Sequence, residues 1–124
     1  LAEIFLNASV DQLSKTKIEW KNEKSMTVVL CSKGYPGKYK KNLTINNLEK
    51  LKLSKKDFIY HAGTKFYKKK LRSNGGRVLN ITSIGNNFLK IRKKIISIID
   101  KIDWKKGFYR KDIGWKVIDK DENY

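Results

Sequence analysis

Alternating apolar and polar residues divide the chain into a β-rich first two-thirds and a helical stretch near its end. Residues 25–32 form a β-branched, nearly continuous apolar run, which predicts a strand covered on both faces. Residues 57–61 and 76–83 predict two further strands, and the basic stretch 65–73 predicts a hairpin. From Phe88 to Ile102, apolar residues recur at steps of three and four, the spacing of an amphipathic helix with Asn86 or Asn87 as its N-cap.

Weaker signals complete the pattern. Apolar positions near helical spacing predict a helix over residues 1–13, and residues 43–45 and 48–51 predict a short strand and a helical turn. The aromatic segment 104–115 is expected to pack back on the sheet. Together these elements predict an α+β domain, with a mostly antiparallel sheet, one long amphipathic helix on a face and an N-terminal helix.

Composition narrows the function classes. The 124 residues predict one domain, and because the chain begins with Leu1 rather than Met we expect it to be a piece of a longer polypeptide. A net charge of +17 points to a polyanion partner or to a solvated surface. Only four of the 29 basic residues are arginines, which weighs against nucleic acid. The chain contains one cysteine, Cys31, and one histidine, His61, so it lacks the ligands of a structural zinc site.

Three short loops hold the candidate chemistry: residues 32–39, 61–65 and 73–80. Glycine lets a backbone approach an anion closely, and an adjacent Lys or Arg supplies the opposing charge. Each loop also has a structural interpretation: a solvated β-turn for the first, a type I′ hairpin turn for Asn74–Arg77. Arg77 favours a phosphate or carboxylate partner, because its planar fork stands in a lysine-rich chain. His61 is a candidate acid or base, although a hydrogen-bonded structural role is more common at a strand end.

Four motifs in this order give the chain a family resemblance. They are VVLCSKGYPGKY at 28–39, HAGTK at 61–65, GGRVLNIT at 75–82 and YRKDIG at 109–114. Together they resemble the C-terminal domain of the phosphoribosylamine–glycine ligase (glycinamide ribonucleotide synthetase) family, in the ATP-grasp superfamily. The resemblance runs from about Leu1 to Val117.

The resemblance implies a cytoplasmic ligase of purine biosynthesis that joins glycine to phosphoribosylamine at the expense of ATP. It implies that ATP and Mg²⁺ are bound mainly by preceding ATP-grasp domains, and that this domain lines the substrate cleft, binds neither cofactor and is inactive alone. Residues 1–24 would be a helix and connector from the preceding domain, 25–118 the domain core and 119–124 a frayed tail. The alternative is a free-standing basic module that binds RNA or another polyanion.

The resemblance also marks the residues expected to bind substrate. Arg77 and the loop amides would hold a phosphate. His61 is the one possible catalytic residue, although it would orient a neighbour more readily than transfer a proton. No metal ligand is assigned within the chain. The expected substrate-binding residues are Ser32, Lys33, Gly34, Tyr35, Pro36, Gly37, His61, Gly63, Thr64, Asn74, Gly75, Gly76 and Arg77.

Overall fold

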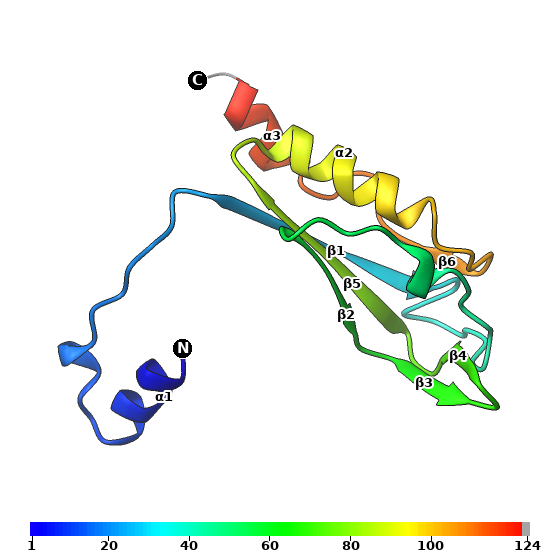
Figure 1. The fold of residues 1–124 in the computed structure, drawn as a ribbon, viewed down its shortest axis with the longest axis horizontal. Helices are drawn as coiled ribbons and strands as arrows, with labels where there is room; N and C mark the ends of the chain where they lie inside the picture. The colour runs from blue at the N-terminus through cyan, green and yellow to red at the C-terminus, as the bar shows by residue number, and fades with distance from the viewer. Residues whose placement is uncertain (123–124) are drawn as a thin grey trace.

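The protein is described by a computed structural model that covers residues 1–122. Its main feature is an antiparallel four-stranded sheet with the strand order β2-β5-β1-β6 (Figure 1). A two-stranded sheet, β3-β4, extends from one end of it. The predicted α+β class and antiparallel sheet are confirmed. The strands are β1 (Lys24–Ser32), β2 (Asp57–His61), β3 (Thr64–Tyr67), β4 (Lys70–Ser73), β5 (Arg77–Gly85) and β6 (Gly107–Phe108).

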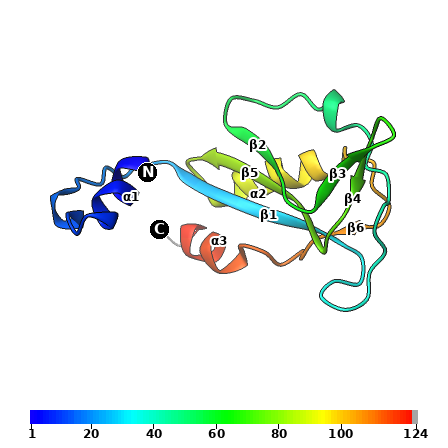
Figure 2. The same cartoon turned by 90° about the horizontal axis from the view of Figure 1, so that it is seen from below.

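Helix α2 (Phe88–Ile99) covers one face of the main sheet, as Figures 1 and 2 show. Its Asn87 N-cap accepts a hydrogen bond from the Lys90 backbone N–H at 2.9 Å. The helix buries Ile91, Ile95, Ile98 and Ile99, which pack with β1 and β5 residues in the core. It ends at Ile99, and Ile102, the last position of the predicted stripe, lies buried in the following turn.

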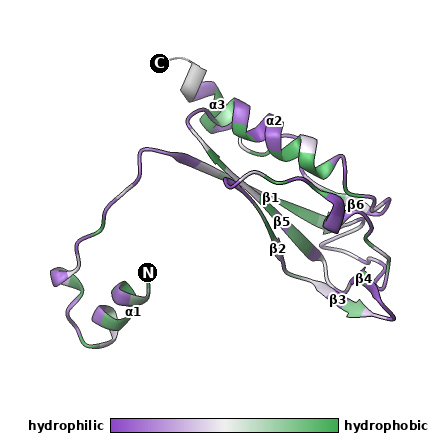
Figure 3. Ribbon diagram, in the orientation of Figure 1, coloured by the Kyte–Doolittle hydropathy of each residue, from purple (hydrophilic) through white to green (hydrophobic). Residues whose placement is uncertain are grey.

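The expectation that β1 is covered on both faces is wrong. Met26, Val28 and Leu30 are buried on the face toward α2, but Val29 and Cys31 on the other face are only half-buried. The reason is that the described helices leave this second face uncovered, so the apolar run does not mark a two-sided core strand. Figure 3 shows the corresponding hydrophobic stretches along β1 and β5 and the mixed surface of α2.

The C-terminal segment packs back on the sheet as predicted. Phe108 in β6 pairs with Cys31 at the edge of β1. Helix α3 (Trp115–Glu122) follows and buries Ile118 beside Met26. It includes residues 119–122 of the segment that was expected to fray, and residues 123–124 lie outside the described part of the chain.

The strand pairing confirms one prediction about the connecting segments and corrects two others. The hairpin predicted over 65–73 is confirmed, and its turn is Lys68–Lys69, with φ of +47° and +58°. The segment Asn74–Arg77 is not a hairpin turn, because β4 and β5 belong to different sheets. Residues 43–45 form no strand in the described structure, and Thr44 makes only an isolated bridge with Arg72.

The N-terminal segment stands apart from the sheet in Figures 1 and 2. Helix α1 (Ala2–Ser9) is shorter than predicted and buries none of its residues. The connector between α1 and β1 carries strongly exposed apolar side chains, among them Trp20 at 87% exposure. Across residues 1–122, no helix is long and apolar enough to cross a membrane.

Candidate functional site

The three glycine-containing loops meet at one end of the main sheet, where β1 ends and β5 begins. Ser32, which is only 1% exposed, donates from its backbone N–H to the Gly76 carbonyl and from its hydroxyl to the Gly75 carbonyl, both at 2.8 Å. On the other side, Gly63 donates to the Arg77 carbonyl at 2.9 Å and accepts from Asn74 at 2.7 Å. The segment Asn74–Arg77 is therefore held between the other two loops by backbone hydrogen bonds.

The glycines at this junction allow the three backbones to approach closely. A Cβ atom on Gly63 would lie 2.5 Å from the Arg77 carbonyl oxygen and 2.8 Å from the Gly75 Cα atom. A Cβ atom on Gly76 would lie 2.0 Å from the ring of Tyr35. These contacts give Gly63, Gly75 and Gly76 a packing role that does not depend on any ligand.

The first loop has its own backbone requirements. Gly34 has a φ of +102°, and a Cβ atom there would meet the Lys38 carbonyl oxygen at 2.3 Å. The loop is thus a tight turn of fixed shape, and its Tyr35 and Tyr39 rings pack edge to face at 6.0 Å. Pro36 and Tyr35 help to line an apolar cavity of about 360 Å³ beside Cys31, Phe108 and Ile113.

Arg77 is exposed at this junction and has no ion-pair partner among the side chains of residues 1–120. Its Cα pairs with that of Cys31 across the sheet. Burial raises the pKa of the Cys31 thiol, and the positive charge of Arg77 opposes that increase. An exposed guanidinium without a carboxylate partner can bind an oxyanion through two parallel hydrogen bonds.

His61 lies at the end of β2 and is exposed. Its Nδ1 atom lies 3.0 Å from the hydroxyl oxygen of Thr64, so the two polar residues of this loop interact with each other. This contact fixes the orientation of the ring and fits a positioning role better than a proton-transfer role, because the described contacts of His61 include no carboxylate.

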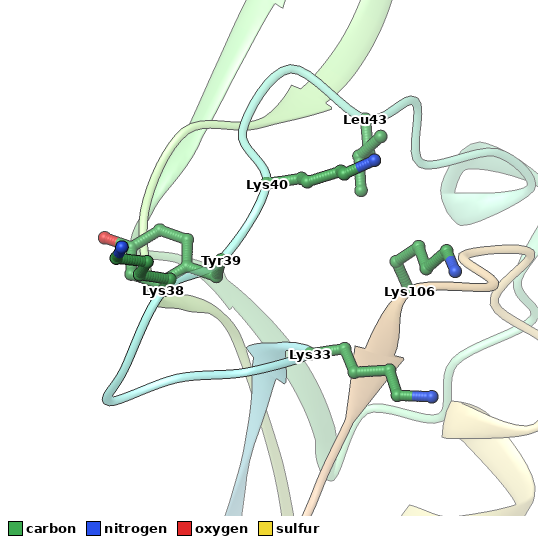
Figure 4. Close-up of a pocket in the computed structure, with 6 residues that line it drawn as sticks. All are labelled: Lys33, Lys38, Tyr39, Lys40, Leu43 and Lys106. Carbon is green, nitrogen blue, oxygen red and sulfur yellow. The ribbon is translucent and has the colours of Figure 1, made fainter.

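Lys33 extends into a second cavity, of about 370 Å³, which Figure 4 shows. The other lining residues are Lys38, Tyr39, Lys40, Leu43 and Lys106. Sequence analysis identified Lys33 but missed Lys40 and Lys106. Lys106 is more than seventy positions from Lys33 in the sequence, and only the pairing of β6 with the end of β1 brings the two together. No local motif could have revealed it.

The face of the main sheet that the described helices leave uncovered carries several apolar and aromatic side chains. We call it the open face and define it by Thr27, Val29, Cys31, Phe58, Tyr60, Asn80 and Thr82, which share one side of the sheet by their register. Phe58 and Tyr60 are 36% and 54% exposed, and their rings stack at 6.1 Å. Adjacent exposed aromatic rings of this kind are typical of a surface that another protein or domain covers.

Comparison with known proteins matches most of this chain to a protein family. Residues 25–116 match the family described as "Phosphoribosylglycinamide synthetase, C domain". The chain is 40% identical over 118 residues to phosphoribosylamine–glycine ligase of Agrobacterium fabrum and 35% identical over 126 residues to that of Escherichia coli. These alignments cover 95% and 99% of this chain but only 27% and 29% of the two relatives.

A solved structure gives the same result. The crystal structure of phosphoribosylamine–glycine ligase from Thermotoga maritima superposes with a TM-score of 0.67 at 29% sequence identity. The match covers 89% of this chain and 27% of the other. The chain therefore spans about a quarter of the length of the proteins that it resembles, and those relatives support the ligase interpretation over the RNA-binding alternative.

Proposed function

The chain belongs to the phosphoribosylglycinamide synthetase C-domain family, and on that premise we propose that it is the C-terminal domain of a phosphoribosylamine–glycine ligase. The whole enzyme would form glycinamide ribonucleotide from phosphoribosylamine, glycine and ATP in purine biosynthesis. The observation that carries this proposal is the junction of the three loops, because motifs from 32–39, 61–65 and 73–80 meet through direct backbone hydrogen bonds. This junction would form one wall of the substrate cleft, and the domain would be inactive alone.

Within that wall, Arg77 is the proposed contact for the phosphate of phosphoribosylamine. The guanidinium is exposed and has no carboxylate partner among the side chains of residues 1–120, and Asn74 in the same loop is also exposed. A bidentate pair with a phosphate would satisfy it. The His61–Thr64 pair would border the same site and orient a substrate group. The remaining expected residues, Ser32 to Gly37 and Gly63, Gly75 and Gly76, would shape the wall.

The residues of this chain do not fit the Mg²⁺ ion that the ligase reaction implies. Among the side chains of residues 1–120, no group of three or more His, Cys, Asp or Glu could hold a metal ion. Magnesium prefers carboxylate and phosphate oxygens. We therefore assign Mg²⁺ and ATP to the preceding ATP-grasp domains and derive no step of the reaction through them here.

The preceding domains of the same polypeptide are the proposed partner of this domain. The open face, with Phe58 and Tyr60 exposed, offers them an apolar contact surface. Residues 1–24 would be the helix and connector from those domains, 25–118 the domain core, and the separate position of α1 agrees with this division (Figure 1). A cytoplasmic location is proposed with the ligase function, and the free thiol of Cys31 suits a reducing compartment.

Kinetics of the full-length ligase test the proposal. Arg77→Ala should raise the KM for phosphoribosylamine at least about tenfold, since a charge-assisted bidentate contact contributes roughly 1.5–3 kcal/mol. The KM values for ATP and glycine should change little. Lys93→Ala removes an exposed cation from α2 and serves as the matched control. An unchanged KM for phosphoribosylamine in the Arg77 variant would remove this residue from the site.

The proposal that the domain is inactive alone is tested separately. The 124-residue chain should neither hydrolyse ATP nor form glycinamide ribonucleotide when all three substrates are supplied. Turnover by the purified chain would contradict the assignment of ATP and Mg²⁺ to the preceding domains.

A further inference from the structure

The cavity beside the first loop is lined by four lysines, Lys33, Lys38, Lys40 and Lys106, and by Tyr39 and Leu43. In Figure 4, the side chains of Lys33, Lys40 and Lys106 extend toward the same side of the cavity, while Lys38 lies with Tyr39 at the opposite side. The volume of about 370 Å³ is that of a small-molecule pocket. Three lysine side chains from different segments thus extend along one side of a concave surface.

The charges of this cavity are uncompensated. None of its lining residues carries a carboxylate, and none of the four lysines has an ion-pair partner among the side chains of residues 1–120. Elsewhere in the chain, lysines do find partners, such as Lys56 with Glu23 at 2.5 Å and Lys94 with Asp57 at 3.7 Å. Like charges around a concave surface create a positive potential that concentrates anions.

The walls of the cavity are fixed by backbone hydrogen bonds. The Lys33 N–H donates to the Lys106 carbonyl at 2.8 Å, which sets the distance between two of the lysines. At the other end of the loop, Asn42 donates to the Ser73 carbonyl at 2.7 Å, and the Arg72 guanidinium donates to the Asn42 carbonyl at 2.8 Å. The backbones of Lys33 and Lys106 are therefore held in place before any anion binds, which lowers the entropic cost of binding.

We infer that this cavity binds a small polyphosphate, a ligand with at least two adjacent phosphate groups such as inorganic triphosphate. Several lysines around one cavity match a ligand that carries several negative charges better than a single planar oxyanion. A single-stranded nucleic acid would need an aromatic platform for its bases. Tyr39 is the one aromatic residue of the lining, and it already packs against Tyr35. The inference does not rest on the proposed ligase function.

Isothermal titration of the 124-residue chain with inorganic triphosphate tests the inference. The chain should bind one triphosphate, and the affinity should fall at least about fivefold between roughly 20 and 150 mM salt, because exposed charges are screened. Lys40→Gln/Lys106→Gln should weaken binding at least about tenfold, since it removes two of the four positive charges that line the cavity. Both residues lie outside the proposed substrate-binding set, so a failure here leaves the ligase proposal intact.

Two further variants give the test its specificity. Lys93→Gln/Lys120→Gln has the same net charge but removes exposed lysines of α2 and α3, and should change the affinity less than about twofold. Lys40→Arg/Lys106→Arg should keep the affinity within about threefold because it keeps both charges. Absence of triphosphate binding at low salt, or an equal loss in both double Gln variants, would overturn the inference. Displacement of triphosphate by a short RNA that binds tenfold more tightly would overturn it in favour of nucleic acid.

Discussion

The contact between Gly63 and the second loop leads to a quantitative prediction. In Gly63→Ala, the new Cβ atom would lie 2.5 Å from the Arg77 carbonyl oxygen and 2.8 Å from the Gly75 Cα atom. Both are backbone atoms, and the Arg77 carbonyl also accepts the hydrogen bond from Gly63 itself at 2.9 Å. Neither atom can rotate away, so the substitution must separate two loops that the structure holds together.

The expected size of this effect follows from two opposing contributions. Overpacking of a well-packed site costs about 1–3 kcal/mol. Replacing glycine with alanine returns about 0.4–1 kcal/mol by restricting the unfolded chain, because the φ of Gly63 lies outside the left-handed region. We therefore expect Gly63→Ala to lower the free energy of unfolding by about 1–2 kcal/mol, measured by urea denaturation of the 124-residue chain.

A glycine from the first loop provides the control. In Gly37→Ala, the nearest contact of the new Cβ atom is the Gly34 carbonyl oxygen at 3.2 Å, which a small shift can relieve. Its free energy of unfolding should stay within about 0.5 kcal/mol of the parent chain. Equal urea midpoints for the Gly63 and Gly37 variants would refute the argument that close loop contact explains Gly63.

Three further predictions concern the scaffold. Burial raises the pKa of Asp57, but hydrogen bonds from Ser54 and Ser83 and the Lys94 ammonium hold it below its usual value. The stability that this carboxylate contributes is therefore complete above about pH 4 and is lost as the pH falls toward the lowered pKa, so the unfolding free energies of Asp57→Asn and the parent chain should converge in acid. Asn87→Ala should cost about 1 kcal/mol in urea denaturation by removing the α2 N-cap. Arg92→Ala should cost about 1–3 kcal/mol in the same assay, because its guanidinium donates to the Lys111 and Ile113 carbonyls.

The fold could be predicted where local pattern and final environment agree. β2, β5 and α2 lie close to their predicted positions. In β5 and α2 the apolar residues face the core on one side, whereas in β2 only Ile59 packs against the core and the exposed Phe58 and Tyr60 lie on the open face. The pattern failed in β1, where Val29 and Cys31 look like core residues but lie on the open face. The hairpin over 65–73 was predicted, but the residues of its turn were not. Two lysines with positive φ, Lys68 and Lys69, go against the usual preference for Asn and Gly.

The candidate site was predictable in its parts but not in its arrangement. Each loop could be recognised from glycines and adjacent cations, yet the hydrogen bonds between Ser32, Gly63 and the second loop depend on strand pairing between distant segments. The lysine-lined cavity could not be predicted from the sequence for the same reason. Lys106 joins Lys33 only through the pairing of β6 with β1, a contact that no spacing in the sequence encodes.

The structure separates two roles that the sequence left combined in the glycine-rich loops. Gly63, Gly75 and Gly76 are explained by contact between loops, so their presence is no longer an argument for an anion. The argument for an anion now rests on side chains that packing does not explain, chiefly the Arg77 guanidinium, which has no ion-pair partner among the described side chains. The two roles should separate in the full-length ligase: Gly63→Ala should lower stability, whereas Arg77→Ala should raise the KM for phosphoribosylamine at unchanged stability. Thermal melts and kinetics on the same two variants test this separation. A loss of stability in Arg77→Ala that matches its rise in KM would contradict it.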